Sequence, residues 1–128
     1  MTDADPQELL RPELGFHAVL GADELIGFRS FGADGRVPGW AYEDSALDTG
    51  GGLRPELVGN GLGRQVISAG LDFGRSQFKP PAFRVTVASF NARALRTVRS
   101  LGFERVARFV STNDWRDFEV LVRPEQPQ

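Results

Sequence analysis

Three glycines in alternating positions, Gly59, Gly61 and Gly63, lie between a segment with strand character and a segment with helix character. A helix that begins at such a junction offers unpaired backbone N–H groups and the positive end of its dipole, which together bind anions. Glycine has no Cβ atom, so the backbone can approach a phosphate closely. The junction therefore predicts a phosphate-binding turn between a strand and a helix.

The spacing of these glycines excludes two common nucleotide-binding turns. A dinucleotide fingerprint, G-x-G-x-x-G, would need a glycine at the position of Arg64. A triphosphate-binding loop would end in Gly-Lys-Ser or Gly-Lys-Thr, whereas this turn ends in Gly63, Arg64 and Gln65. We therefore expect a phosphate-containing ligand of another class.

The rest of the chain alternates between strand and helix patterns. Residues 14–31 predict a hairpin of two strands, and residues 32–39 form a loop rich in glycine. A short strand is predicted over 46–53, where the three glycines at 50–52 indicate a bulge or the close approach of another group. The later predicted elements are a helix over 62–74, a strand over 83–88, a helix over 91–101 ended by Gly102, and a hairpin of 103–110 with 117–122. This order predicts a mixed α/β sheet.

Composition limits the classes of function. A chain of 128 residues with 41% hydrophobic residues fits one domain, 1–128. The absence of cysteine excludes disulfides, a thiol nucleophile and thiolate metal ligands, and we expect no metal. A net charge of -2 argues against a nucleic-acid partner. No leader or long apolar run is visible, so we expect a cytoplasmic protein without membrane contact.

Two blocks of the sequence resemble the GNAT N-acetyltransferase superfamily. Residues 53–63, LRPELVGNGLG, resemble a signature in which a strand ending in V-x-P precedes R-G-x-G-x-G. Residues 91–94, NARA, and 101–103, LGF, resemble the N-x-x-A helix of the family and its L-G-F ending. The resemblance covers about residues 14–122.

This resemblance implies an α/β (α+β) fold that forms one acyl-coenzyme A-binding domain. The sheet would be mixed and mostly antiparallel, with a central parallel pair of splayed strands and flanking helices. Members of the family begin with a strand and one or two helices before the hairpin. Only residues 7–11 suggest such a helix here, so we expect short or missing amino-terminal elements.

The resemblance also implies a cosubstrate, acetyl-CoA, whose acetyl group a primary amine attacks directly. The amine would belong to a small molecule, a peptide or a protein, and the family pattern allows a homodimer. Backbone amides of the glycine-rich turn would hold the pyrophosphate, and the strand before it would bind pantetheine. The implied cofactor-binding residues are Leu53, Val58, Gly59, Asn60, Gly61, Leu62, Gly63, Arg64 and Asn91. Asn91 is equally suited to cap its helix.

Asp48, on the strand before the splay, is the expected general base, acting directly or through water. Glu43 and Asp44 are rivals, and each of the three acids has an alternative as a solvated or turn-capping residue. Many family members place a tyrosine proton donor where this chain has Val98, and a basic residue where it has Val58. These departures leave a second function open, an acyl-CoA-binding module with weak or no turnover.

Overall fold

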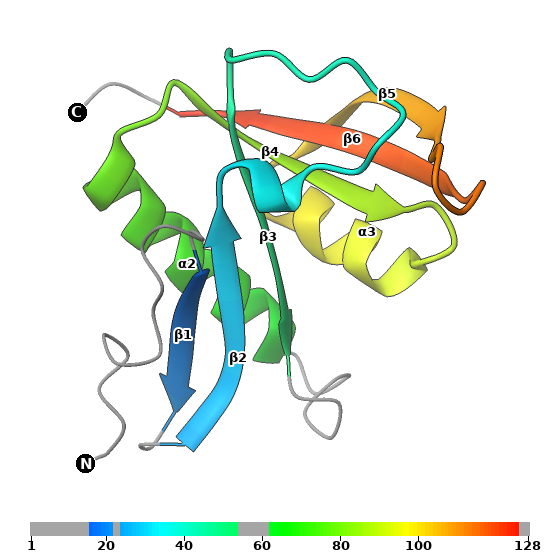
Figure 1. Ribbon diagram of the computed structural model, residues 1–128. Helices are drawn as coiled ribbons and strands as arrows, with labels where there is room; N and C mark the ends of the chain where they lie inside the picture. The colour runs from blue at the N-terminus through cyan, green and yellow to red at the C-terminus, as the bar shows by residue number, and fades with distance from the viewer. Residues whose placement is uncertain (1–15, 22–23, 54–61, 126–128) are drawn as a thin grey trace.

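The computed structural model describes residues 16–21, 24–53 and 62–125. Every predicted strand and helix is present (Figure 1). The elements are β1 (Phe16–Gly21), β2 (Glu24–Phe31), η2 (Ala33–Gly35), β3 (Leu47–Leu53), α2 (Leu62–Phe78), β4 (Ala82–Ala88), α3 (Ala92–Ser100), β5 (Glu104–Val110) and β6 (Asp117–Pro124). The expectation about amino-terminal elements lies outside the described residues. None of the described helices is long and apolar enough to cross a bilayer.

The described strands form one six-stranded sheet in the order β1-β2-β3-β4-β6-β5. Neighbouring strands run antiparallel except for the central pair, β3 and β4. This pair is joined only through Leu47 with Phe83 and Asp48 with Arg84. Beyond these residues the two halves of the sheet diverge as a V (Figure 1). The expected mixed sheet with a central splayed parallel pair is therefore confirmed.

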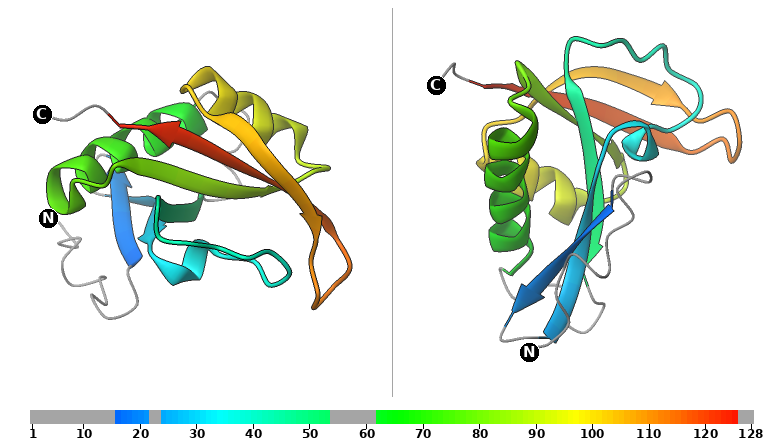
Figure 2. Two further views of the ribbon diagram at one scale, coloured as in Figure 1. Left: turned by 90° about the horizontal axis from the view of Figure 1, so that it is seen from above. Right: turned by 60° about the vertical axis from the view of Figure 1, so that its left-hand side comes forward.

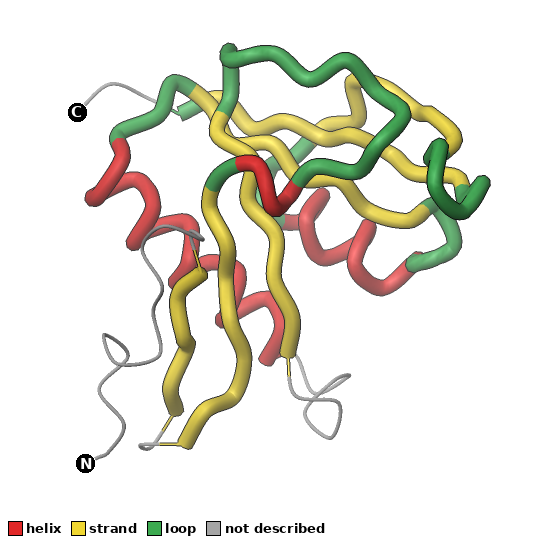
Figure 3. Tube along the Cα trace, in the orientation of Figure 1, coloured by secondary structure: helices red, strands yellow, loops and turns green. Residues whose placement is uncertain are grey.

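The two faces of the sheet are covered differently. Helices α2 and α3 lie on one face, and the loop that contains η2 crosses the other (Figures 2 and 3). Alternation along β4 follows from the pleat, so Phe83 and Val85 face the helices while Arg84 and Thr86 face the loop. The expected flanking helices are confirmed, and both flank the same face.

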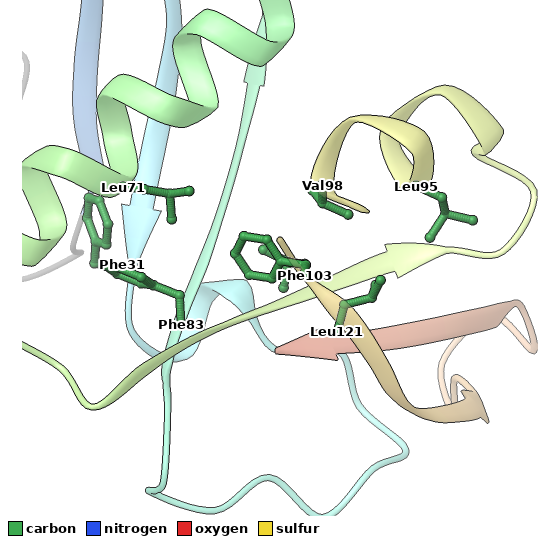
Figure 4. Close-up of a cluster of buried hydrophobic side chains, with 8 residues drawn as sticks. Phe31, Leu71, Phe83, Leu95, Val98, Phe103 and Leu121 are labelled. Carbon is green, nitrogen blue, oxygen red and sulfur yellow. The ribbon is translucent and has the colours of Figure 1, made fainter. Parts of the chain in front are cut away.

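The hydrophobic core lies between the sheet and the two helices (Figure 4). It draws on both halves of the V, so the helices connect strands that are not bonded to each other. Its buried members are Phe31, Leu71, Phe83, Val85, Leu95, Val98, Phe103 and Leu121. The diverging strands are thus held apart in a fixed geometry by packing and not by a loose hinge.

Helix α2 extends one turn past the predicted end at Gly74 and finishes at Phe78. A Cβ atom at Gly74 would lie 2.6 Å from the Phe31 ring and 3.1 Å from the Phe83 ring. This glycine therefore permits close packing of helix on sheet within α2. Gly102, in contrast, ends α3 with a φ of 96°, as predicted.

Candidate functional site

A cavity of about 210 Å³ opens where β3 and β4 part. We call it the splay cleft. Its apex is the end next to the pair Asp48 and Arg84, where the following residues of β3 and β4, Thr49 and Val85, line the cleft. Its lining comes from β2, β3, β4 and both helices: Arg29, Thr49, Gly50, Gly51, Ile67, Val85, Thr86, Val87, Ala88, Asn91, Ala94 and Val98. The cleft therefore reaches through the sheet between its two halves.

One wall of the splay cleft is bare backbone. Beyond Asp48, β3 bonds to β2 along one edge, and its edge toward β4 has no ladder. The β2–β3 register is continuous from Thr49 to Leu53, so the glycines at 50–52 do not form a bulge. Gly50 and Gly51 instead present peptide groups without side chains to the cleft. Such an edge can bind an extended ligand that carries amide groups.

Among the described residues of the predicted cofactor-binding set, Asn91 is the one that lines the splay cleft. Leu53 is the last residue of β3, and α2 begins with Leu62, Gly63 and Arg64. Among the described residues, nothing lies within 4 Å of a Cβ atom added at Gly63. Residues 58–61, which complete the predicted pyrophosphate turn, lie outside the described residues.

Arg64 and Asn91 each hold a helix in place. The exposed Arg64 donates from Nε to Ser100 Oγ at 3.1 Å, which ties the start of α2 to the end of α3. Asn91 Oδ1 accepts the Ala94 backbone N–H at 3.1 Å, so this residue caps α3. Asn91 also lines the splay cleft, and the two expected roles are compatible.

Asp48 is surrounded by guanidinium groups. Its carboxylate accepts from Arg84 Nε at 2.6 Å, from Arg84 Nη2 at 2.8 Å and from Arg36 Nε at 2.7 Å. The residue is 2% exposed and lines a second cavity of about 250 Å³, not the splay cleft. The hydrogen bonds to Asp48 raise the pKa of Arg84 above its ordinary value. Because both oxygens of Asp48 are occupied, this geometry favours a structural role over that of a general base.

The rival acids are also placed away from the splay cleft. Glu43 accepts from Ser45 Oγ at 2.5 Å, from the Ser45 backbone at 3.0 Å and from Arg84 Nη1 at 3.1 Å. The Ser45 bonds, aided by Arg84, hold the pKa of Glu43 below its usual range. Asp44 is fully exposed, 3.7 Å from Arg36. Among the residues described, no carboxylate lines the splay cleft.

Arg29 is a residue of the splay cleft that the sequence patterns did not single out. It is 6% exposed, and its Nη2 donates to Thr49 Oγ1 at 3.1 Å. Its buried Nε has no hydrogen-bond partner in the described part of the chain. Burial lowers the pKa of the guanidinium to about 10. Arg29 lies two residues before Phe31, on the same face of β2. A charged residue on a face that carries apolar side chains was the sequence signal that could have pointed to Arg29.

A hydroxyl pair lies on the loop side of the splay cleft. Tyr42 Oη is 2.7 Å from Thr86 Oγ1, and Thr86 lines the cleft. The Val37 backbone N–H donates to Tyr42 Oη at 3.1 Å. The position at which family members carry a tyrosine is Val98, which is 3% exposed, lines the cleft and cannot donate a proton.

Comparisons with known proteins agree with this architecture. No family model matches the chain. It is 30% identical over 100 residues to the N-alpha-acetyltransferase RimI of Mycobacterium tuberculosis, a match that covers 78% of this chain and 58% of that protein. The chain thus spans less than two thirds of that curated relative.

Two solved acetyltransferase structures share the fold. The putative acetyltransferase yncA from Salmonella typhimurium, solved with its cofactor acetyl-CoA, gives a TM-score of 0.69 at 24% identity and covers 92% of this chain and 69% of its own. A chimera of the spermidine N-acetyltransferase SpeG from Vibrio cholerae and hSSAT gives 0.69 at 19% identity, over 85% of this chain and 65% of its own. Sequence likeness to RimI, the fold and the splayed central strands all agree, and the chain has the fold of the GNAT acetyltransferases.

Proposed function

We propose that this chain binds acetyl-CoA in the splay cleft and transfers the acyl group to a primary amine. The observation that carries the proposal is the parting of β3 and β4 directly after a buried ion pair, which leaves a cavity of about 210 Å³ between them. A narrow slot with one wall of unpaired peptide edge suits the amide-bearing pantetheine arm. The structure of yncA with acetyl-CoA supports the same cosubstrate here.

The cofactor would run from the start of α2 to the apex of the splay cleft. The first N–H groups of α2, together with the turn at 58–61, would hold the pyrophosphate. The open edge of β3 would bind pantetheine, with Asn91 lining the opposite side. This direction brings the thioester close to Thr49, next to the last β3–β4 residue pair.

The acceptor amine would enter from the loop face, because α2 and α3 cover the other face (Figure 2). Its nitrogen attacks the thioester carbon, the C–S bond breaks, and the amine gives up a proton to water, since no described carboxylate lines the cleft. Backbone N–H groups of the open β3 edge are suited to stabilise the oxyanion. Thr86 lines the cleft and its hydroxyl is hydrogen-bonded to Tyr42. Because residue 98 is not a tyrosine, the Thr86 hydroxyl would be the group that gives a proton to the departing thiolate.

A second candidate function is acyl-CoA binding with weak or no turnover. It is favoured by Val98, which places an apolar side chain in the splay cleft where family members carry their proton donor. The name of RimI denotes an N-alpha-acetyltransferase and that of SpeG a spermidine N-acetyltransferase. An amine of either kind is therefore a rational first acceptor.

Calorimetric titration with CoA and acetyl-CoA tests binding, and release of free thiol with amines tests turnover. The amines should include a peptide with a free amino terminus, spermidine and a small primary amine. Amine-dependent thiol release supports the transferase. Saturable binding without thiol release for any amine favours the binding module. Absence of binding by both ligands would refute both candidates.

A further inference from the structure

Arg29 is a buried cation without a counter-charge in the described part of the chain. Its Nη2 donates to the neutral Thr49 hydroxyl, and its buried Nε has no hydrogen-bond partner among the residues that the structure describes. An ionised group in this position is costly unless an anion or further hydrogen bonds compensate for the lost water. With a pKa of about 10 it nevertheless remains protonated at neutral pH.

In another buried arginine of this fold, charged partners compensate for the lost hydration. Arg84 is 1% exposed and is paired with Asp48 and Glu43. Arg29 has a comparable burial, and among the described residues no carboxylate forms an ion pair with it. The chain therefore neutralises one buried guanidinium internally and leaves the other facing the cavity.

The structure makes room for Arg29 on two sides. A Cβ atom at Gly70 of α2 would lie 2.8 Å from Arg29 Cγ, 3.2 Å from Cδ and 3.3 Å from Nε, so the glycine accommodates the stem and the Nε atom. The cross-strand partner of Arg29 on β3 is Gly51, which adds no side chain. The guanidinium is thus held by packing along its stem, while the space beyond the glycine edge of β3 stays open.

The position of Arg29 along the splay cleft excludes the pyrophosphate as its anion. Gly70, which contacts the Arg29 stem, comes eight residues after Leu62, or about 12 Å along the axis of α2. Arg29 bonds to Thr49, directly after the last β3–β4 pair. It therefore lies near the apex, and the acyl end of the cofactor is the part that reaches the apex.

We propose that Arg29 binds a carboxylate on the acyl group, so that the splay cleft prefers acidic acyl-CoA, such as malonyl- or succinyl-CoA, over acetyl-CoA. This inference rests on the proposed function. A carboxylate matches the terminal N–H groups of the planar guanidinium, which can bind both of its oxygens. The ligand would supply the charge that the described residues do not.

The test compares ligands on the unmodified protein first. Succinyl-CoA and butyryl-CoA have acyl chains of equal length and differ in the terminal carboxylate. We expect succinyl- or malonyl-CoA to bind about tenfold or more tightly than butyryl- and acetyl-CoA, as a charge-assisted hydrogen-bond pair implies. Equal or weaker binding of both acidic ligands overturns the inference while leaving acyl-CoA binding intact. Absence of binding by all four refutes the proposed function as well.

Variants then assign the preference to this side chain. Arg29→Met removes the charge but keeps an apolar stem, and we expect it to fold because an uncompensated charge is lost. In this variant the preference for succinyl- over butyryl-CoA should disappear. Arg96→Met, on the exposed side of α3, changes net charge equally and should retain the preference. Retention of the preference in Arg29→Met overturns the assignment to Arg29. If that variant does not fold, the ligand comparison on the unmodified protein tests the preference for acidic acyl groups.

Discussion

Asp48 and Arg84 are the last paired residues of β3 and β4, and their side chains join at 2.6 and 2.8 Å where the strands part. Both side chains are 1% exposed. The ion pair therefore joins the two halves of the sheet on the loop face. On the helix face, α2 packs closely at Gly74 against Phe31 of β2 and Phe83 of β4. The apex of the splay cleft is therefore fixed from both sides.

Substitution of Asp48 tests whether it is structural or a general base. Asp48→Asn leaves Arg84 buried with only Glu43 as a charged partner, and we expect the free energy of unfolding to fall by about 3–5 kcal/mol. Urea denaturation measures this loss. Asp44→Asn, a fully exposed control, should change stability by less than about 0.5 kcal/mol. Unchanged stability with abolished thiol release would instead identify Asp48 as the base.

Two glycines of α2 should respond in opposite ways to alanine. At Gly74 the new methyl group would meet the buried rings of Phe31 and Phe83, so we expect a loss of about 1–3 kcal/mol despite the better helix propensity. At Gly63 the methyl group would meet nothing among the described residues, and we expect a gain of about 0.5–1 kcal/mol. Thermal and urea unfolding measure both. A stabilised Gly74→Ala protein would contradict the close helix–sheet packing.

Gly63 also offers a clean test of the pyrophosphate position. Gly63→Glu places a negative charge in the first turn of α2, and we expect it to weaken CoA affinity by about tenfold or more. Gly63→Gln has nearly the same size without the charge and serves as the matched control. Calorimetric titration of both variants separates charge from bulk. Equal CoA affinity in the two variants would place the phosphates elsewhere.

Local sequence patterns were sufficient to predict the order of the strands and helices and the end of α3 at Gly102. The alternation of apolar residues in strands and their spacing in helices are both properties of short segments. The end of α2 was missed because Gly74 acts through rings on β2 and β4, which only the tertiary fold brings to it. The partners of Asp48 were missed for the same reason. Arg84 is 36 residues away in sequence, and the parallel register alone places it opposite.

The carboxylate of Glu125 should govern part of the acid stability. It is 4% exposed and accepts from Arg123 at 2.7 Å and Arg75 at 2.9 Å. Burial opposes ionisation, but these hydrogen bonds outweigh it and hold the pKa of Glu125 below its usual range. Because the folded-state pKa is the lower one, the stabilisation is present above the unfolded value of about 4.3 and is lost as the pH falls through the folded value.

Glu125→Gln therefore should lower stability near neutral pH and lose less of it on acidification than the unmodified protein. Urea denaturation between about pH 7 and pH 3 measures the two curves, which should converge below the ordinary pKa of glutamate. The exposed Glu104→Gln substitution is the matched control. Parallel curves for Glu125→Gln and the unmodified protein would rule out this contribution.

Thr86→Val tests whether the hydroxyl pair supplies the proton to the thiolate. The substitution keeps the shape of the side chain but breaks the link to Tyr42 at the wall of the splay cleft. We expect thiol release to slow by about tenfold or more at saturating acyl-CoA, while acyl-CoA affinity changes by less than about twofold. Thr97→Val, on α3, is the matched control, since its hydroxyl bonds only to the Arg93 carbonyl of the same helix among the described residues. Equal turnover of the two variants would show that water protonates the thiolate, because Val98 offers no proton and Thr86 would then have no part in the step.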